Sequence, residues 1–272
     1  MRHRRDDPDR RRAKQHGAAA GMTDGVTLYA FNCGWFQCRP GYFVEGDEGD
    51  YLRGPVPSYL IRHPKGRVLF DTGMGERYRR ELADALPANK FGLQWFEGMD
   101  IATRLKAIEV DPASINWIVN SHLHIDHCGG NALLPNASVI LQRREWQAAQ
   151  AAEESGTYEA LDYDTGQPIR LIDGEHDLFG DGTVRIVPTW GHTHGHQSVV
   201  VRLPKGEVLL AGDCCYTQRN LDAMVLPRAT VDVEQGMLTF DRLAKARAGG
   251  TRILFGHDGR QWATIAENAA FD

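Results

Sequence analysis

The chain has 272 residues, 42% of them hydrophobic and 25% charged, with a formal net charge of −5. This length suits one large domain with a substantial core and excludes two ordinary domains joined by a long linker. The charge provides no basic face, so nucleic acid is not an expected partner. No apolar run approaches the ~18 residues that a membrane span requires, so no membrane association is expected.

The first 21 residues differ in composition from the rest of the chain. They contain many Arg and Asp side chains but almost no large apolar ones, which predicts a disordered basic leader over residues 1–21. They also lack the apolar stretch of ~7–15 residues that an export signal requires. One folded domain is therefore expected over residues 22–272, and Met22 is an alternative start of the chain.

From Val26 the chain alternates short β-branched and aromatic runs with amphipathic helical stretches. The pattern in the first half predicts strands over 26–31, 58–63, 67–73, 117–120 and 137–142. It predicts helices over 76–86, 101–110 and 143–154. The strand over 117–120 leads directly into a cluster of histidines.

The second half repeats this plan. Its pattern predicts strands over 169–172, 184–189, 198–203, 207–211 and 252–255, and a helix over 233–248. Two similar halves predict an α+β fold of four layers, with two mixed sheets face to face and helices outside. Such layering leaves loops at one sheet edge, where a site can be assembled.

Cysteine usage indicates the compartment. The chain has five cysteines, Cys33, Cys38, Cys128, Cys214 and Cys215, an odd number without any Cys-x-x-Cys pair. This favours free thiols in a reducing compartment over a disulfide framework. The expected location is the cytoplasm.

The segment SHLHIDHCGG, residues 121–130, contains four side chains that can bind a metal: His122, His124, Asp126 and His127. In an extended segment, residues two apart point the same way, so His122 and His124 can hold one ion. A turn after them would aim Asp126 and His127 at a second ion. Imidazole nitrogen with carboxylate oxygen is the ligand chemistry that zinc prefers.

Further ligands are expected where distant strands end. The segments WGHTHGH (190–196), LLAGD (209–213) and LFGHD (254–258) each place a histidine or aspartate after a predicted strand. A lone histidine is more often a surface or core residue, which is the expectation for His3, His16, His63 and His176. His196 fits a supporting role behind the ligands, and His194 fits an exposed position.

These motifs resemble the metallo-β-lactamase superfamily, whose hallmark is His-x-His-x-Asp-His followed by a later Gly-His, an Asp and a final His. Within it, the chain is most similar to the N-acyl homoserine lactonases. The similar segments are YLIRHPKGRVLFDTGM (59–74), NSHLHIDHCGGN (120–131), GHTHGHQS (191–198), GDCCYTQRN (212–220) and FGHD (255–258). Two departures are Trp190, where a Pro is usual, and His194, which replaces a Pro common in the lactonases.

The resemblance implies a metallo-β-lactamase-fold hydrolase domain over residues 22–272 that holds two Zn²⁺ ions, with other divalent metals as alternatives. It assigns His122, His124 and His192 to one ion. It assigns Asp126, His127 and His257 to the other, with Asp213 as the bridge. It also implies that Asp71 supports the ligand loops, for which a carboxylate closing a turn is an equal alternative.

The resemblance further implies the reaction, which is opening of the lactone ring of N-acyl homoserine lactones by attack of a metal-bridging hydroxide. Tyr216 matches the tyrosine beside the substrate carbonyl and would donate a hydrogen bond to it. Asp126 would carry a proton to the leaving alkoxide. A packed tyrosine with its hydroxyl at the surface is the structural alternative for Tyr216.

The acyl chain of such a substrate would need an apolar groove. Aromatic residues concentrate in two stretches, Trp35, Phe36, Tyr42, Phe43 and Tyr51, then Phe91, Trp95 and Phe96. We expect them to line or cover the site. Core packing, or a subunit interface like that of the family's homodimers, is an equal alternative.

Other functions are compatible with the same motifs. A metallohydrolase of this fold acting on another lactone, a thioester or a phosphotriester is the main alternative, because the pocket rather than the motif selects the substrate. A di-iron oxidoreductase would need electrons from a flavin domain or partner that this chain does not encode. A non-catalytic binding protein would have no use for the intact ligand set and Tyr216.

Overall fold

The computed structural model describes residues 25–44, 52–77, 94–151 and 158–271. The predicted leader and most of the predicted helix over 76–86 lie outside these residues. So do Tyr51, Phe91 and the end of the predicted helix over 143–154.

The larger of two sheets contains seven strands in the described part of the chain, in the order β12-β1-β2-β3-β4-β5-β6. Its strands are β1 (Thr27–Cys38), β2 (Leu52–His63), β3 (Gly66–Phe70), β4 (Trp117–Val119), β5 (Ser138–Gln142), β6 (Ile169–Ile172) and β12 (Ala270–Phe271). Neighbouring strands are antiparallel from β12 to β3 and parallel from β3 to β6.

The smaller sheet contains five strands of the described chain, in the order β11-β10-β9-β8-β7. Its strands are β7 (His176–Asp177), β8 (Val184–Pro188), β9 (Gln197–Leu203), β10 (Gly206–Leu210) and β11 (Arg252–Leu254). All neighbours are antiparallel except β10 and β11, which are parallel. The strands β8, β10 and β11 therefore run in the same direction and end at the same edge.

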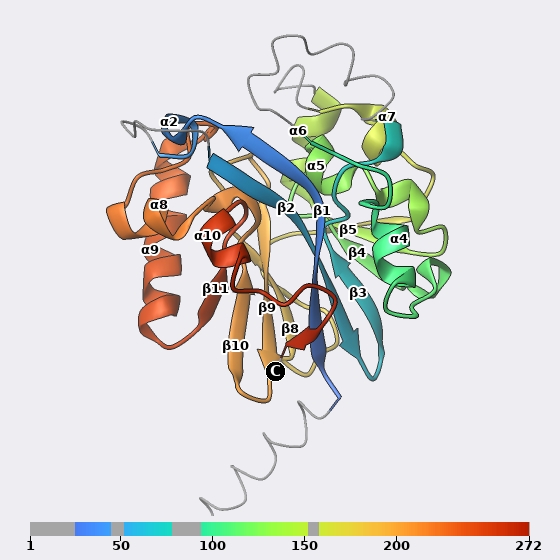
Figure 1. The fold of residues 1–272 in the computed structure, drawn as a ribbon. Coiled ribbons are helices and arrows are strands. Elements are labelled where there is room, and N and C mark those ends of the chain that lie inside the picture. Colours follow the sequence, from blue (N-terminus) through green and yellow to red (C-terminus); the bar gives the residue numbers. More distant parts are fainter. Residues whose placement is uncertain (1–24, 45–51, 78–93, 152–157, 272) are drawn as a thin grey trace, which may run out of the picture.

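Helices cover the outer faces of the two sheets (Figure 1). On the side of the larger sheet lie α4 (Ile101–Lys106), α5 (Ile125–Cys128), α6 (Arg143–Ala151) and α7 (Ala160–Tyr163). On the side of the smaller sheet lie α8 (Gln218–Ala223) and α9 (Val233–Ala248), and the short helices α2 (Pro40–Phe43) and α10 (Gly259–Trp262) complete the set. None of the described helices is long and apolar enough to cross a membrane.

Three apolar layers lie between the four layers of helices and sheets, one between the two sheets and one between each sheet and its helices. This confirms the predicted four-layer sandwich. Along β1, Leu28 and Ala30 face the smaller sheet while Phe31 packs on the helical side with Ile101 of α4. This alternation follows from the period of two residues in a strand. On the other side of the molecule, Phe240 of α9 packs on the outer face of the smaller sheet. Both faces of each sheet are therefore buried.

The strands β1 and β2 are longer than the pattern predicted. Their ends form a hairpin arm in which Trp35 pairs with Pro55 and Asn32 with Pro57, with an irregularity between Asn32 and Trp35. Proline lacks an amide hydrogen and usually marks the end or edge of a strand, so the two prolines concealed this extension. The arm brings Pro55 to the edge of the sandwich where β11 ends.

Helix α4 is shorter than predicted, because it ends at Lys106 rather than at residue 110. Glu109 has a positive φ of 59°, which a continuing right-handed α-helix does not allow. Helix α9, in contrast, has the bounds that the pattern predicted. Its N-cap Asp232 accepts a hydrogen bond from the amide of Gln235, and Gly249 follows its last residue.

Phe240→Ala tests the packing of α9 on the smaller sheet. Phe240 is fully buried, so its loss should lower the free energy of unfolding by about 3–5 kcal/mol, measured by urea unfolding. Leu238→Ala on the same helix is the control, because Leu238 is 46% exposed, and its effect should stay below about 0.5 kcal/mol. Equal losses in the two variants would contradict this packing.

Candidate active site

Five strands end at one edge of the sandwich, and each is followed by a polar side chain. Asp71 follows β3, His122 follows β4, His192 follows β8, Asp213 follows β10 and His257 follows β11. Asp213 lies in a short 3₁₀ turn over Gly212–Cys214. Residues far apart in the sequence therefore meet because their strands point toward the same edge.

The seven residues predicted to bind metal are brought together in two groups. His122, His124 and His192 form the first group. Asp126, His127, Asp213 and His257 form the second group. Within each group, one ligand atom from every residue lies within 4.8 Å of the others. The three residues that the resemblance assigned to each ion fall in separate groups, and Asp213, expected as the bridge, falls in the second group.

The turn that separates the two groups is the short helix α5. His124 is its N-cap residue and has an extended backbone, with φ −72° and ψ 151°. Asp126 and His127 lie inside the helix and are buried. The extended segment therefore delivers His122 and His124 to the first group, and the helical turn delivers the next two ligands to the second group.

Asp213 belongs to the second group but directs one carboxylate oxygen toward each group. Its Oδ2 lies 3.4 Å from Nε2 of His192, in the first group. Its Oδ1 lies 3.0 Å from Nε2 of His257 and 3.2 Å from Nε2 of His127, both in the second group. This orientation suits a carboxylate that serves two cations.

Three of the histidines have one ring nitrogen fixed by a hydrogen bond on the side away from the site. Nδ1 of His122 lies 2.9 Å from Oγ of Ser121, and Nδ1 of His127 lies 2.8 Å from Oδ2 of Asp71. Nδ1 of His257 lies 2.7 Å from the carbonyl oxygen of Pro55 on the β2 arm. Such bonds set the tautomer of each ring and leave Nε2 facing the site.

Asp71 supports the ligand loop rather than only closing a turn. Its Oδ1 accepts a hydrogen bond from the amide of Ser121 at 2.6 Å, and its Oδ2 accepts one from the hydroxyl of Ser121 at 2.8 Å. The same Oδ2 meets His127, as described above. Asp71 has a positive φ of 57°, an uncommon conformation for a residue other than glycine. The structure thus agrees with the role that the resemblance implied.

His196 also supports the site, as the sequence indicated. Its Nε2 accepts a hydrogen bond from the amide of Asp213 at 3.0 Å, while its Nδ1 lies 2.8 Å from Oγ1 of Thr189. Burial lowers the pKa of His196 well below its ordinary value, so the ring is neutral and can accept that bond. His194 is half-buried rather than exposed, and the Trp190 ring is stacked under the guanidinium of Arg144.

Sequence reasoning missed Glu145, a fully buried carboxylate in the first turn of α6. It accepts hydrogen bonds from residues on both sides of the first ligand group, which are described below. Burial raises the pKa of Glu145, while the hydrogen bond from Thr193, the charge of His124 and the hydrogen bonds from Leu123 and Tyr158 oppose that rise. One signal was available, because Glu145 shares the buried face of α6 with Ala148 and Ala149, three and four residues later.

The protonation of the ligands follows from their burial and from each other. Burial lowers the pKa of His122 well below its ordinary value, and the neighbouring imidazoles add to this. Burial opposes charge on His127 and His257 too, but the carboxylates of Asp126 and Asp213 outweigh it and raise the pKa of both rings. Burial also opposes charge on Asp213, but His257 and His127 hold its pKa well below the usual range.

The side chains fit a pair of divalent cations. Nε2 of His122 is buried and has no hydrogen-bond partner among the described residues. Nε2 of His127 and Oδ1 of Asp213 are buried and lack a partner with hydrogen-bond geometry in the same part of the chain. Leaving such groups unsatisfied is costly, and cations between them would satisfy all three atoms. Nitrogen and carboxylate donors are those of zinc sites.

Tyr216 lies beside ligands of both groups. Its ring centroid is 5.9 Å from that of His192 and 5.0 Å from that of His257. Phe43 contacts the Tyr216 ring edge-on at 5.5 Å and stacks parallel to His257 at 6.2 Å. Tyr216 is buried, so its ring is packed beside the two groups.

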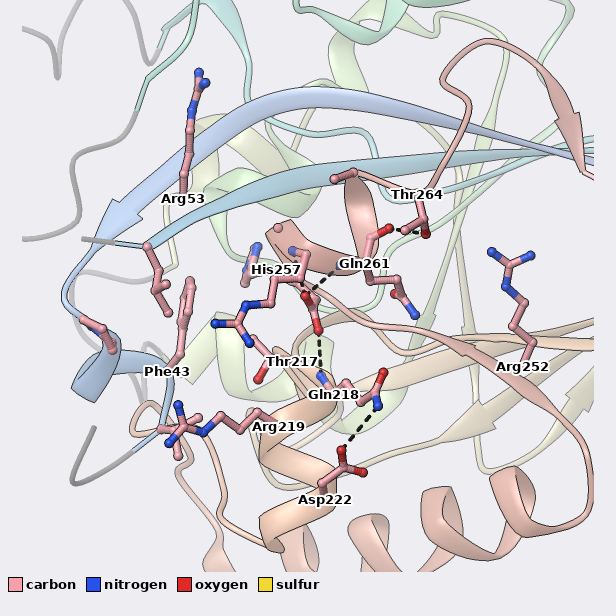
Figure 2. A pocket seen from close by; sticks show the side chains of 17 residues that line it. Phe43, Arg53, Thr217, Gln218, Arg219, Asp222, Arg252, His257, Gln261 and Thr264 are labelled. Carbon is pink, nitrogen blue, oxygen red and sulfur yellow. Dashed lines mark hydrogen bonds between the residues drawn. The ribbon is translucent and has the colours of Figure 1, made fainter. Parts of the chain in front are cut away.

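A pocket of about 1170 Å³ opens next to the second ligand group (Figure 2). Its wall includes His257 and Phe43 as well as Thr217, which follows Tyr216. Of the other predicted aromatic residues, Phe36 and Trp95 pack with Val56, Met74 and Ile125, while Trp35 packs on the core and Phe96 is exposed.

Comparison with known proteins places this geometry in a family. Residues 51–257 match the model of the metallo-beta-lactamase superfamily. The chain is 34% identical over 264 residues to the N-acyl homoserine lactonase AttM of Azorhizobium caulinodans, covering 90% of this chain and 97% of that protein. It is 34% identical over 218 residues to an N-acyl homoserine lactonase of Bacillus cereus, covering 77% of this chain and 84% of the relative.

A solved structure gives the same result. An N-acyl homoserine lactone hydrolase, crystallised with the product N-hexanoyl-L-homoserine at its catalytic metal centre, superposes with a TM-score of 0.81 and 28% identity. The match covers 91% of this chain and 99% of that one. The chain therefore belongs to the metallo-β-lactamase superfamily and, within it, to the N-acyl homoserine lactonase-like subfamily.

Proposed function

We propose that this protein is a dizinc N-acyl homoserine lactonase, a hydrolase that opens the lactone ring of its substrate to an open-chain hydroxy acid. The observation that carries the proposal is the position of Asp213, with one oxygen toward each of two groups of buried ligands. The names of relatives that cover 90% and 77% of the chain supply the substrate class.

In this proposal each ligand has a defined place. His122, His124 and His192 hold one zinc ion. Asp126, His127 and His257 hold the other, and Asp213 contributes to both. A bound pair of zinc ions supplies a nucleophile at neutral pH and polarises the substrate carbonyl. The protein supplies rigid, dry surroundings, because six of these seven ligands are buried.

Two side chains act on the substrate. Tyr216 donates its hydroxyl hydrogen to the lactone carbonyl oxygen as negative charge develops there. Its buried ring lies between His192 and Phe43, which fixes its direction. Asp126 carries a proton to the alkoxide that leaves when the ring C–O bond breaks. Its Oδ2 lies 3.1 Å from Nε2 of His127, so it is held at the centre of the site.

The acyl chain meets an apolar surface in this proposal. Ile125 lies between the ligands His124 and Asp126 and packs with Phe36, Trp95 and Met74. Met74 is fully buried, but the partly exposed side chains of Phe36, Trp95 and Ile125 give a surface that an acyl chain can contact. The five cysteines are all buried free thiols, which supports a cytoplasmic location. The homodimer stays a prediction.

Metal removal tests the proposal directly. The purified protein should contain two zinc ions per chain and hydrolyse acyl-homoserine lactones faster than simple aliphatic lactones, thioesters or a phosphotriester. Dialysis against a chelator should abolish hydrolysis, and zinc should restore it. Elemental analysis and a panel of substrates give both results in parallel. If a thioester or phosphotriester were turned over faster by orders of magnitude, the proposed substrate class would be wrong, whereas the proposed metal site would stand.

Tyr216→Phe tests the hydrogen-bond donor. The variant keeps the ring that packs against His192, so its zinc content should equal that of the unmodified protein. Its kcat should fall by about tenfold to a thousandfold, because one donor to the developing negative charge is lost. Steady-state kinetics with a matched zinc assay measure both. An unchanged kcat would remove Tyr216 from the reaction.

Proton release on zinc binding tests the protonation state of the His127 and His257 rings. Because the pKa values of His127 and His257 are raised, both rings hold protons to a higher pH in the metal-free protein than an ordinary histidine does. A metal ion binds only the neutral ring, so zinc addition should release protons and zinc affinity should rise with pH. Calorimetry in buffers of different ionisation enthalpy measures the release. Binding of zinc at pH 7 without proton release would contradict the raised pKa values.

A further inference from the structure

The carboxylate of Glu145 connects two loops that carry ligands of the first group. Its Oε1 accepts a hydrogen bond from the amide of Leu123 at 3.0 Å. Its Oε2 accepts hydrogen bonds from the hydroxyl of Thr193 at 2.6 Å and from the amide of Gly195 at 3.1 Å. Tyr158 donates a further bond to Oε1 at 3.0 Å. All four partners approach the carboxylate as donors in this arrangement.

The donors lie next to the ligands in the sequence. Leu123 lies between His122 and His124, and Thr193 directly follows His192. These are the three residues of the first group. Each oxygen of Glu145 therefore holds a different loop, one after β4 and one after β8, and the carboxylate fixes the distance between them.

The close approach of α6 to the second loop is a separate observation. The backbone of Gly195 lies so near the backbone of Glu145 that a Cβ atom at position 195 would overlap it. Glycine is therefore required there for the loop to reach the first turn of α6. The loop thus rests directly against the helix that carries the carboxylate.

The second ligand group has other supports. Asp71 holds His127, and the carbonyl of Pro55 holds His257. The amide of Asp213 is held by His196. None of these three contacts includes Glu145. Removal of the Glu145 carboxylate should therefore loosen the first group more than the second.

We propose that Glu145 is a positioning residue that sets the geometry of the His122, His124 and His192 site and thereby its affinity for one of the two metal ions. This inference rests on the proposed metal pair and assigns Glu145 to one half of it, whereas Asp71 reaches both halves through Ser121 and His127. Glu145 touches neither ion nor substrate. It acts through the backbone on both sides of the ligands, and partners of this kind commonly change metal affinity by about tenfold to a hundredfold.

Glu145→Gln tests this by metal content rather than by activity. The amide keeps the size of the carboxylate but presents an NH₂ group to one loop, where an acceptor is needed. After dialysis against graded chelator, the variant should lose one zinc ion per chain at about tenfold to a hundredfold less chelator than the unmodified protein. Zinc anomalous diffraction from crystals of the same samples should show that the emptied position is the three-histidine site.

Two threonine variants provide a second test and a matched control. Thr193→Val removes one donor to Glu145 with little change of shape. This variant should also lose the zinc ion of the three-histidine site at less chelator than the unmodified protein, but by a smaller factor than Glu145→Gln. Thr183→Val removes a buried hydroxyl that donates to the carboxylate of Asp181, at the opposite end of β8 from the site. It should leave both zinc affinities unchanged.

The outcomes separate this inference from the proposed function. An unmodified protein that binds no zinc would overturn both. An unmodified protein with two zinc ions, combined with a Glu145→Gln variant that keeps both equally well or loses both together, would overturn only the role of Glu145. Selective loss of the three-histidine ion in Glu145→Gln and Thr193→Val, but not in Thr183→Val, would establish it.

Discussion

Burial of ionisable side chains is the constraint on which this structure depends. Six of the seven clustered residues of the site are buried, and several imidazoles and carboxylates lie in direct contact there. Removing such groups from water costs several kcal/mol per charge unless other charges and hydrogen bonds compensate. The carboxylates partly compensate the imidazoles, which is why the pKa of Asp213 falls while that of His127 rises. Cations in the site would complete this compensation.

The fold meets this constraint with two kinds of support. Strand ends fix where each ligand begins, since the sheets are rigid and buried on both faces. Hydrogen bonds behind the ligands then fix ligand rings and the loops that carry the ligands. Asp71, His196 and Glu145 provide these bonds from three different elements, and each connects loops that are far apart in the sequence. Preorganisation of this kind allows the chemistry to proceed without rearrangement of the protein.

The sequence predicted the ligands because their chemistry is local. The His122–His127 segment has few structural uses, and His192, Asp213 and His257 each follow an apolar strand. The layers were also predictable, because β-branched runs and an amphipathic α9 have distinct periods. The predictions failed where tertiary contacts decide. Pro55 and Pro57 concealed the end of β2, although the carbonyl of Pro55 holds a ligand.

Supporting residues were harder to predict than ligands, since nothing in their own neighbourhood indicates a metal. Glu145 lies in an ordinary helical segment and receives donors from residues 22, 48 and 50 positions away. Its position on the apolar face of α6 was the one local signal. Only the folded chain shows that the two loops meet there. Asp71 was recognisable through the resemblance, whereas its hydrogen bonds to Ser121 required the structure.

The most direct test of this account is a crystal structure of the protein as purified, with anomalous diffraction data collected at the zinc edge. The account predicts two anomalous peaks, one among His122, His124 and His192, the other among Asp126, His127 and His257, with Asp213 between them. A single peak, or a map without peaks at these positions in an active enzyme, would contradict it.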